Sequence, residues 1–134
     1  GGGGGYPKFK RVRLEKEVMV TLAGEPGKPG RQGQTVITCD GPMEVDSRRS
    51  KARFWRNVQV KDARGFIRSD RLDVTLEPIT NRMKRATFWG NVEIHHENQM
   101  STSRRVIYWP NPGRTILAGH PRLVMLTENE RMVE

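Results

Sequence analysis

A short pattern of aromatic, polar and β-branched residues occurs twice in this chain. The segment ARFWRNVQV at 52–60 returns as ATFWGNVEI at 86–94, an interval of 34 residues. A weaker third match begins at Met100 and ends at Leu123, and in it Gly119 takes the place of Gly90. A fixed interval of this length is typical of one supersecondary unit used more than once, so the chain is expected to consist of repeated units.

Each unit contains two extended runs joined by a polar turn. The turns at 47–50, 78–82 and 110–113 are rich in Ser, Asn, Pro and Gly, which is the chemistry of hairpin connections. Apolar residues alternate along the runs, and a period of two indicates strands with one buried face. No long stretch places its apolar residues at helical spacing, so almost no helix is expected.

These patterns predict an all-β chain. A strand predicted at Val12 to Leu22 and three stacked hairpins make one domain of about eight strands, spanning 6–134. The five glycines at 1–5 are predicted to be a flexible linker. The segment 24–33, rich in Gly, Pro and charge, is predicted to be a mobile surface loop.

Charge narrows the class of partner. The net charge of +9 and a pI near 10.4 favour an anionic partner such as nucleic acid, an anionic lipid or an acidic sugar phosphate.

The single cysteine, Cys39, has no partner for a disulfide bond, and we assign it no role. The sequence contains neither an apolar run long enough to span a membrane nor a secretory signal core.

Residues suited to catalysis are few. Adjacent His95 and His96 point to opposite faces of a strand and cannot chelate one metal ion together, although Glu93 and Glu97 leave a surface metal site open as an alternative. His120 is expected to have a structural role in a bend. Carboxylates beside predicted turns are expected to cap backbone N–H groups: Asp40, Asp46, Asp70 and Asp73. We therefore expect a binding protein with no catalytic residue, metal site or cofactor, not an enzyme.

The aromatic pairs divide between the two faces. Successive side chains of a strand point to opposite faces, so Phe54 and Phe88 are expected to face the core, whereas Trp55 and Trp89 are expected to face outward. The two tryptophans are expected either to stack on each other from neighbouring strands or to form a base-stacking platform beside basic residues. The basic residues concerned are Arg53, Arg56 and Arg85. The second alternative predicts a protein that binds single-stranded nucleic acid.

Three stretches carry a resemblance to a known family. The first has Asp40, five residues and Asp46, then a turn and Ala-x-Phe-x-x-Asn-Val-x-Val ending at Val60. The second contains Gly-Asn-Val-x-Ile ending at Ile94, and the third contains Ile-Leu-x-Gly-x-Pro-x-Leu ending at Leu123. In these motifs the chain resembles the OstA-like family, the periplasmic lipopolysaccharide-transport proteins of the LptA and LptC type.

The resemblance implies an open β-jellyroll, a V-shaped stack of antiparallel hairpins. Its apolar interior would hold the acyl chains of lipopolysaccharide and pass them towards the outer membrane, while sugars and phosphates stay outside. The residues expected to bind lipid are Val45, Phe54, Val58, Val60, Leu72, Val74, Leu76, Phe88, Val92, Ile94, Tyr108, Leu117 and Leu123. The same face would also form the ordinary core of a β-sandwich that has no ligand.

Partners and location are implied in the same way. Members of the family join end to end through the edges of their terminal strands. The expected partners are therefore lipopolysaccharide, other jellyroll proteins of the transport bridge and further copies of this chain, with no nucleic acid. The expected location is the periplasm, with an inner-membrane anchor as an option.

A third hypothesis, an enzyme acting on an acidic polysaccharide, would require a role for Asp40, Asp70 or His120.

Overall fold

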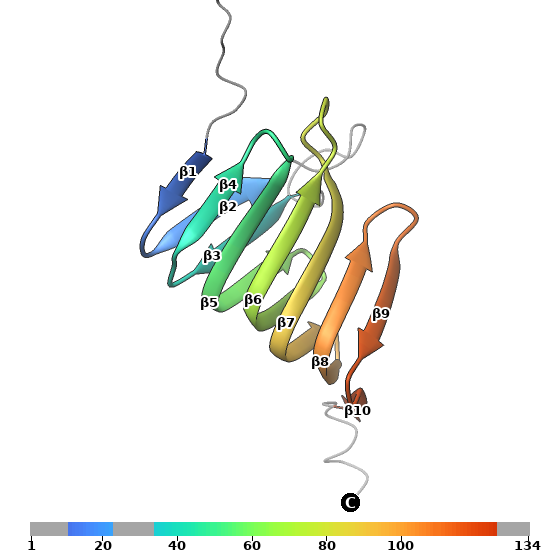
Figure 1. The fold of residues 1–134 in the computed structure, drawn as a ribbon. Coiled ribbons are helices and arrows are strands. Elements are labelled where there is room, and N and C mark those ends of the chain that lie inside the picture. The colour runs from blue at the N-terminus through green and yellow to red at the C-terminus, as the bar shows by residue number, and fades with distance from the viewer. Residues whose placement is uncertain (1–10, 23–33, 126–134) are drawn as a thin grey trace, which may run out of the picture.

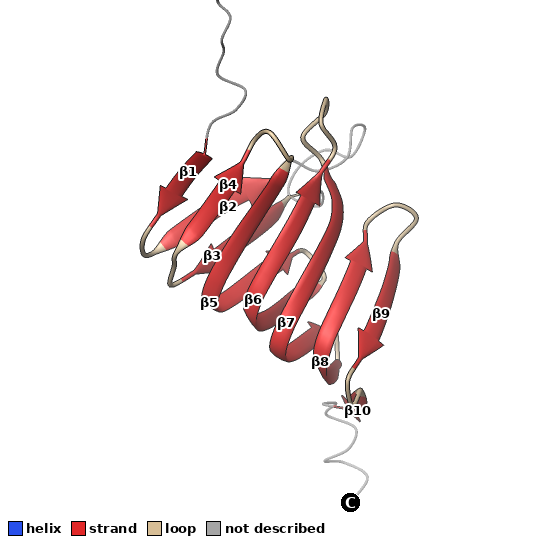
Figure 2. Cartoon of the chain, viewed as in Figure 1, coloured by secondary structure: helices blue, strands red, loops and turns tan. Residues whose placement is uncertain are grey.

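The computed structural model describes residues 11–22 and 34–125. The predicted linker at 1–5 and the predicted loop at 24–33 lie outside the described residues. The elements are β1 (Arg11–Leu14), β2 (Val18–Leu22), β3 (Thr35–Cys39), β4 (Met43–Asp46), β5 (Lys51–Asp62), β6 (Gly65–Leu76), β7 (Met83–His96), β8 (Gln99–Trp109), β9 (Arg114–Ala118) and β10 (Arg122–Met125). The expected all-β fold is confirmed for this part of the chain, which Figure 2 shows as strands joined by loops. The described residues form no helix with the length and hydrophobicity needed to cross a membrane.

All strands belong to one open antiparallel sheet that folds over on itself. The first half of β5 pairs with β4 and its second half pairs with β3. In the same way the two halves of β8 pair with β10 and β9. We call β1, β4, β9 and the adjoining halves of β5 to β8 the front layer, and β2, β3, β10 and the other halves the rear layer (Figure 1).

The long strands bend where the repeated motif lies. The register shifts between Trp55 and Val58 in β5, and between Trp89 and Val92 in β7. The residues inside these shifts have positive φ angles: 71° and 53° at Arg56 and Asn57, and 83° and 47° at Gly90 and Asn91. Gly and Asn adopt this conformation at low cost, and the extra residues bend the strand, so the repeat specifies the fold line between the layers.

Two expectations about strand number are wrong. The single strand predicted at Val12 to Leu22 is two strands, because the chain passes from the front to the rear layer at 15–17, where Glu17 has a φ of 53°. The sheet has 10 strands where about eight were expected, since the bends also divide β3 from β4 and β9 from β10. The hairpin turns predicted at 47–50, 78–82 and 110–113 are confirmed, because each lies between consecutive antiparallel strands.

The core lies between the two layers. Paired residues in the front layer bring one apolar row together: Met43, Phe54, Leu72, Phe88, Val106 and Leu117. A second row, apolar except for Ser101, crosses the rear layer: Ile37, Val60, Ile67, Ile94, Ser101 and Leu123. Each row faces the other layer, so apolar side chains from both halves of a bent strand are buried together.

Candidate functional site

The predicted lipid-binding residues all belong to the interior, but they differ in accessibility. Those in the centre are buried by one another, with at most 2% of each exposed: Phe54, Val58, Leu72, Val74, Phe88 and Val92. Those around the centre are partly buried against it: Val45, Val60, Leu76, Ile94, Tyr108 and Leu117. Leu123, at the end of the rear row, is 62% exposed. The interior is therefore a packed core that opens towards β9 and β10.

The opposite end of the interior is also partly open. Leu14 of β1 pairs with Met43 and continues the front row, and it is 45% exposed. The outermost strands are β1 and β2 at this end of the sheet and β9 and β10 at the other. Each of them has one pairing partner among the described strands. Apolar side chains and unpaired backbone edges therefore occur together at both ends of the sheet.

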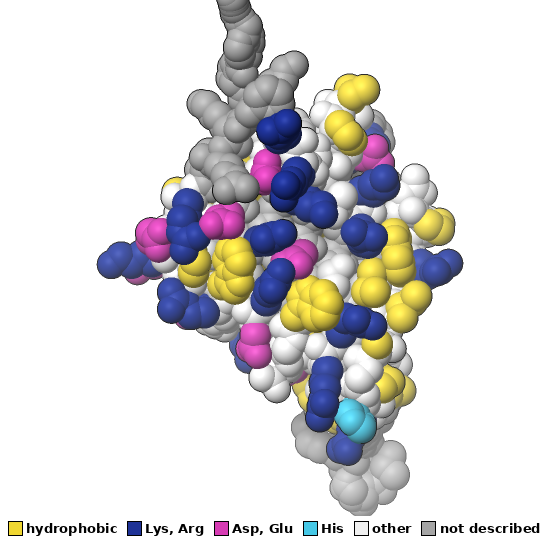
Figure 3. Space-filling view, viewed as in Figure 1, with side chains coloured by type: hydrophobic (Ala, Val, Ile, Leu, Met, Phe, Trp, Pro, Cys, Tyr) yellow, Lys and Arg dark blue, Asp and Glu magenta, His cyan; other side chains and the backbone are white. Residues whose placement is uncertain are grey.

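A row of alternating tryptophan and arginine crosses the outer face of the front layer. Register places Trp55 beside Arg71, Arg71 beside Trp89, and Trp89 beside Arg105, on four consecutive strands. The Arg71 guanidinium carbon lies 5.8 Å from the Trp55 ring centroid, and that of Arg105 lies 5.4 Å from the Trp89 centroid. Both distances suit cation–π contact. Figure 3 shows this face, where hydrophobic and basic side chains intermingle.

The outward direction of both tryptophans is confirmed, but direct stacking between them is wrong. Trp55 is on β5 and Trp89 on β7, and Arg71 of β6 lies between them. The interval of 34 residues corresponds to two strands of the sheet, so equivalent residues of successive units are never on adjacent strands. Arg71 and Arg105 are themselves 34 residues apart, as are Ser69 and Ser103, and this spacing could have revealed the row.

The four singled-out aspartates do not share one role. Asp46 does cap a turn, because its Oδ1 accepts hydrogen bonds from the backbone N of Arg48 and Arg49 at 3.1 and 3.3 Å. Capping is wrong for the two aspartates of β6. Asp70 Oδ2 accepts a hydrogen bond from Asn91 Nδ2 at 3.0 Å, and Asp73 accepts two from Arg71. Both lie within β6, which runs from Gly65 to Leu76, and not beside a turn.

His95 and His120 lie in different parts of the fold. His95 is outside the rear layer, stacked on Phe66 with ring centroids 4.2 Å apart and with Nε2 3.1 Å from Glu93 Oε1. His120 has a φ of 55° and lies in the bend between β9 and β10, as expected. Across the described ranges no three His, Cys, Asp or Glu side chains gather as a metal site would require. Burial raises the pKa of the Cys39 thiol above its ordinary value.

Ser69 and Ser103 are the buried polar residues at the fold line. Ser69 Oγ donates to the carbonyl of Arg71 at 3.0 Å. Ser103 Oγ lies within hydrogen-bond distance of the carbonyls of Arg105 and Ala118, at 3.1 and 2.6 Å. Each buried hydroxyl thus has a backbone carbonyl partner close to the register shift, as buried polar groups require. These residues therefore stabilise the fold line and leave the site chemistry to the interior and the outer row.

No protein-family model, curated protein or solved structure matches this chain.

Proposed function

We propose that this protein binds and transports lipopolysaccharide in the periplasm as an open β-jellyroll of the OstA-like type. One observation carries the proposal. Apolar side chains lie between the layers from Leu14 in the front layer, through the buried centre, to Leu123 in the rear layer, and both of these end residues are exposed. An interior of this kind suits an elongated apolar ligand that enters at one end. The protein acts by binding and passing on its ligand, without catalysing a reaction and without a cofactor.

The acyl chains supply most of the binding free energy. Transfer of an acyl chain from water to an apolar site gives about 0.8 kcal/mol per CH₂. An exposed basic residue near an anionic headgroup gives about 1 kcal/mol. The interior therefore holds the lipid, and the basic outer surface orients its phosphates and acidic sugars.

The strand edges provide the route to partners. β9 and β10 end the sheet at one side and β1 and β2 at the other, each with one paired neighbour among the strands described. Strand addition at such edges would join this chain to other jellyroll proteins of a transport bridge, or to further copies of itself. Leu14 and Leu123 beside the edges would then continue one apolar path from chain to chain.

Leu123→Asp is expected to weaken lipopolysaccharide binding at least tenfold, or about 1.4 kcal/mol, because it places a charge in the apolar entrance. The protein should remain folded, since Leu123 is 62% exposed. The measurement is equilibrium binding of fluorescent lipopolysaccharide at low and high salt, with folding checked by circular dichroism. Binding of the unaltered protein should survive high salt.

The matched control is Val124→Asp on the same strand. Val124 is 38% exposed and, one residue from Leu123, points to the opposite face. Equal losses of affinity in the two variants would show that the lipid does not enter between the layers. Absence of lipopolysaccharide binding by the unaltered protein would refute the proposed function itself.

Binding of single-stranded nucleic acid is the second candidate, because the Trp–Arg row is basic and aromatic. A short oligothymidylate measured in the same series tests it. Affinity that falls steeply with salt, as counterions are released, together with no binding of lipopolysaccharide, would favour nucleic acid.

A further inference from the structure

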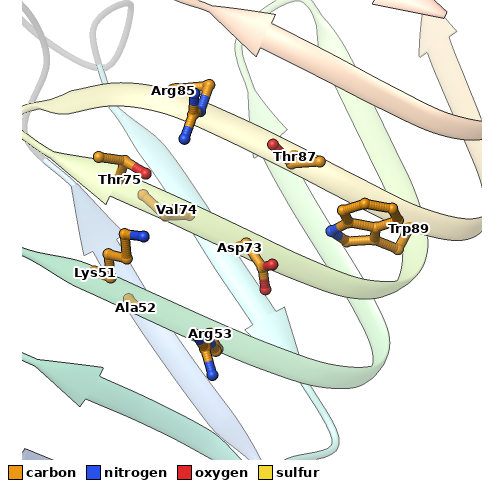
Figure 4. A pocket seen from close by; sticks show the side chains of 9 residues that line it. All are labelled: Lys51, Ala52, Arg53, Asp73, Val74, Thr75, Arg85, Thr87 and Trp89. Atoms are coloured by element: carbon orange, nitrogen blue, oxygen red, sulfur yellow. The ribbon is translucent and has the colours of Figure 1, made fainter. Parts of the chain in front are cut away.

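Nine side chains form a grid on the outer face of the front layer, which we call the outer-face grid. Strand register arranges them in three rows across β5, β6 and β7: Lys51, Thr75 and Arg85; Arg53, Asp73 and Thr87; Trp55, Arg71 and Trp89. A depression of about 170 Å³ lies within it, and all of the grid except Trp55 and Arg71 contributes to its lining (Figure 4). The depression is therefore bounded by basic, hydroxyl and aromatic groups.

The grid carries uncompensated positive charge. It contains four cationic side chains and one carboxylate, Asp73. Both oxygens of Asp73 accept hydrogen bonds from Arg71, at 3.0 Å each. Lys51, Arg53 and Arg85 form no ion pair with any residue in 11–22 or 34–125. Three exposed cations thus surround one depression whose carboxylate is already paired, an arrangement that favours a phosphate group.

Trp89 adds a second kind of recognition. Its indole ring is 38% exposed and closes one end of the depression, across from Lys51 (Figure 4). An aromatic ring has a negative face that attracts the C–H groups of a sugar ring, while the hydroxyls of Thr75 and Thr87 suit its oxygen atoms. Phosphate and sugar contacts are therefore available within a single depression.

We propose that the outer-face grid binds a phosphorylated sugar. The phosphate lies among Lys51, Arg53 and Arg85. The sugar ring packs against the part of Trp89 that lines the depression, which Arg105 does not line although its guanidinium contacts the same ring.

Nucleic acid fits this surface less well, because bases stacked on both tryptophans would compete with Arg71, which lies over the Trp55 ring and is held by its ion pair with Asp73. The site is independent of acyl-chain binding, since Trp89 faces away from the interior that Phe88 fills.

Nuclear magnetic resonance of the indole N–H groups tests the proposal. The probes are glucose 1-phosphate, glucose, inorganic phosphate and a short oligothymidylate, with the three tryptophan signals assigned by Trp→Phe variants. We expect glucose 1-phosphate to shift the Trp89 signal saturably and to leave that of Trp109 unchanged. Glucose and inorganic phosphate should each bind about tenfold more weakly, because each lacks one set of contacts.

Arg53→Gln and Arg85→Gln are each expected to weaken glucose 1-phosphate binding about tenfold. Arg68→Gln is the matched control, an exposed arginine of β6 in the rear layer whose loss changes the net charge equally and should leave affinity unchanged. Equal weakening in all three variants, or no shift of Trp89, would overturn the site. So would oligothymidylate binding more tightly than glucose 1-phosphate with both Trp55 and Trp89 shifted. Lipopolysaccharide binding through Leu123 is measured separately, so failure of one proposal is distinguishable from failure of the other.

Discussion

Replacing Phe88 with alanine is expected to lower the free energy of unfolding by about 3–5 kcal/mol. The ring is 1% exposed and lies in register between Leu72 and Val106, both 0% exposed. Loss of its carbons removes apolar burial and leaves a cavity that rigid strands on both sides cannot fill. Phe54, at the equivalent position of the repeat and also 1% exposed, should show a similar loss when replaced by alanine.

Urea denaturation followed by circular dichroism measures this loss. Leu123→Ala is the control within the same interior, and because that side chain is 62% exposed its replacement should cost below about 1 kcal/mol. A loss of less than about 1 kcal/mol for Phe88→Ala would mean that the centre of the interior is not packed. The central residues would then line an open groove, and acyl chains would occupy the whole length between the layers.

The burial of Phe88 also decides which variants can test lipid binding. Phe88→Asp or Val92→Glu would place a charge at a position with at most 1% exposure, and either change should unfold the protein. Loss of binding in such a variant would reveal nothing about the lipid. Leu123→Asp avoids this difficulty, because the interior reaches solvent at Leu123, which is 62% exposed.

The sequence predicted the strands and their faces well. Strict alternation around Phe54 and Phe88 indicated which residues point inward, and the turn residues at 78–82 marked a real hairpin. In β5 and β7 the bends leave no trace in the alternation, because two residues within the shift, such as Arg56 and Asn57, preserve it on either side. In β6 the bend is marked only by a change of phase, since the buried position Ser69 is followed by Leu72 and Val74. Without the bends, one cannot tell that a single strand contributes to two layers.

Prediction of the candidate sites from the sequence was limited in the same way. The alternation placed the predicted lipid-binding residues on the interior face but left out buried residues such as Ile37 and Val106. It also gave no measure of accessibility, which depends on distance from the sheet edge: Phe88 and Leu123 share a face and differ from 1% to 62% in exposure.

The sequence grouped Arg53 and Arg85 with the two outward tryptophans, but the rest of the outer-face grid was missed because it depends on cross-strand register. Lys51, Asp73 and Arg85 come from three strands, and only the paired structure places them together.

Gly41→Ala is expected to destabilise the protein by about 3 kcal/mol or more. Gly41 lies in the bend between β3 and β4 with a φ of 105°, a conformation that strains any residue with a side chain. An added Cβ would also meet the backbone of the bend between β1 and β2, at 2.7 Å from Lys16 Cα and closer still to the Glu15 carbonyl. Gly41 cannot shift away easily, because its N donates to the Trp55 carbonyl at 3.1 Å and its carbonyl accepts from Arg56 Nε at 2.6 Å.

Gly113→Ala separates conformational strain from steric conflict. Gly113 has a comparable φ of 93°, but its added Cβ would come no closer than 3.8 Å to the Pro110 carbonyl. Its replacement should therefore lower the free energy of unfolding only by the cost of backbone strain, about 1–3 kcal/mol.

Hydrogen exchange provides a second measurement. In Gly41→Ala, exchange should accelerate at the Glu17 amide, which donates to the Asp40 carbonyl at 3.1 Å, because the two bends are forced apart. Equal losses of stability in the two variants, with Glu17 still protected, would mean that the bends do not hold each other and that β1 and β2 are positioned by their strand pairing alone.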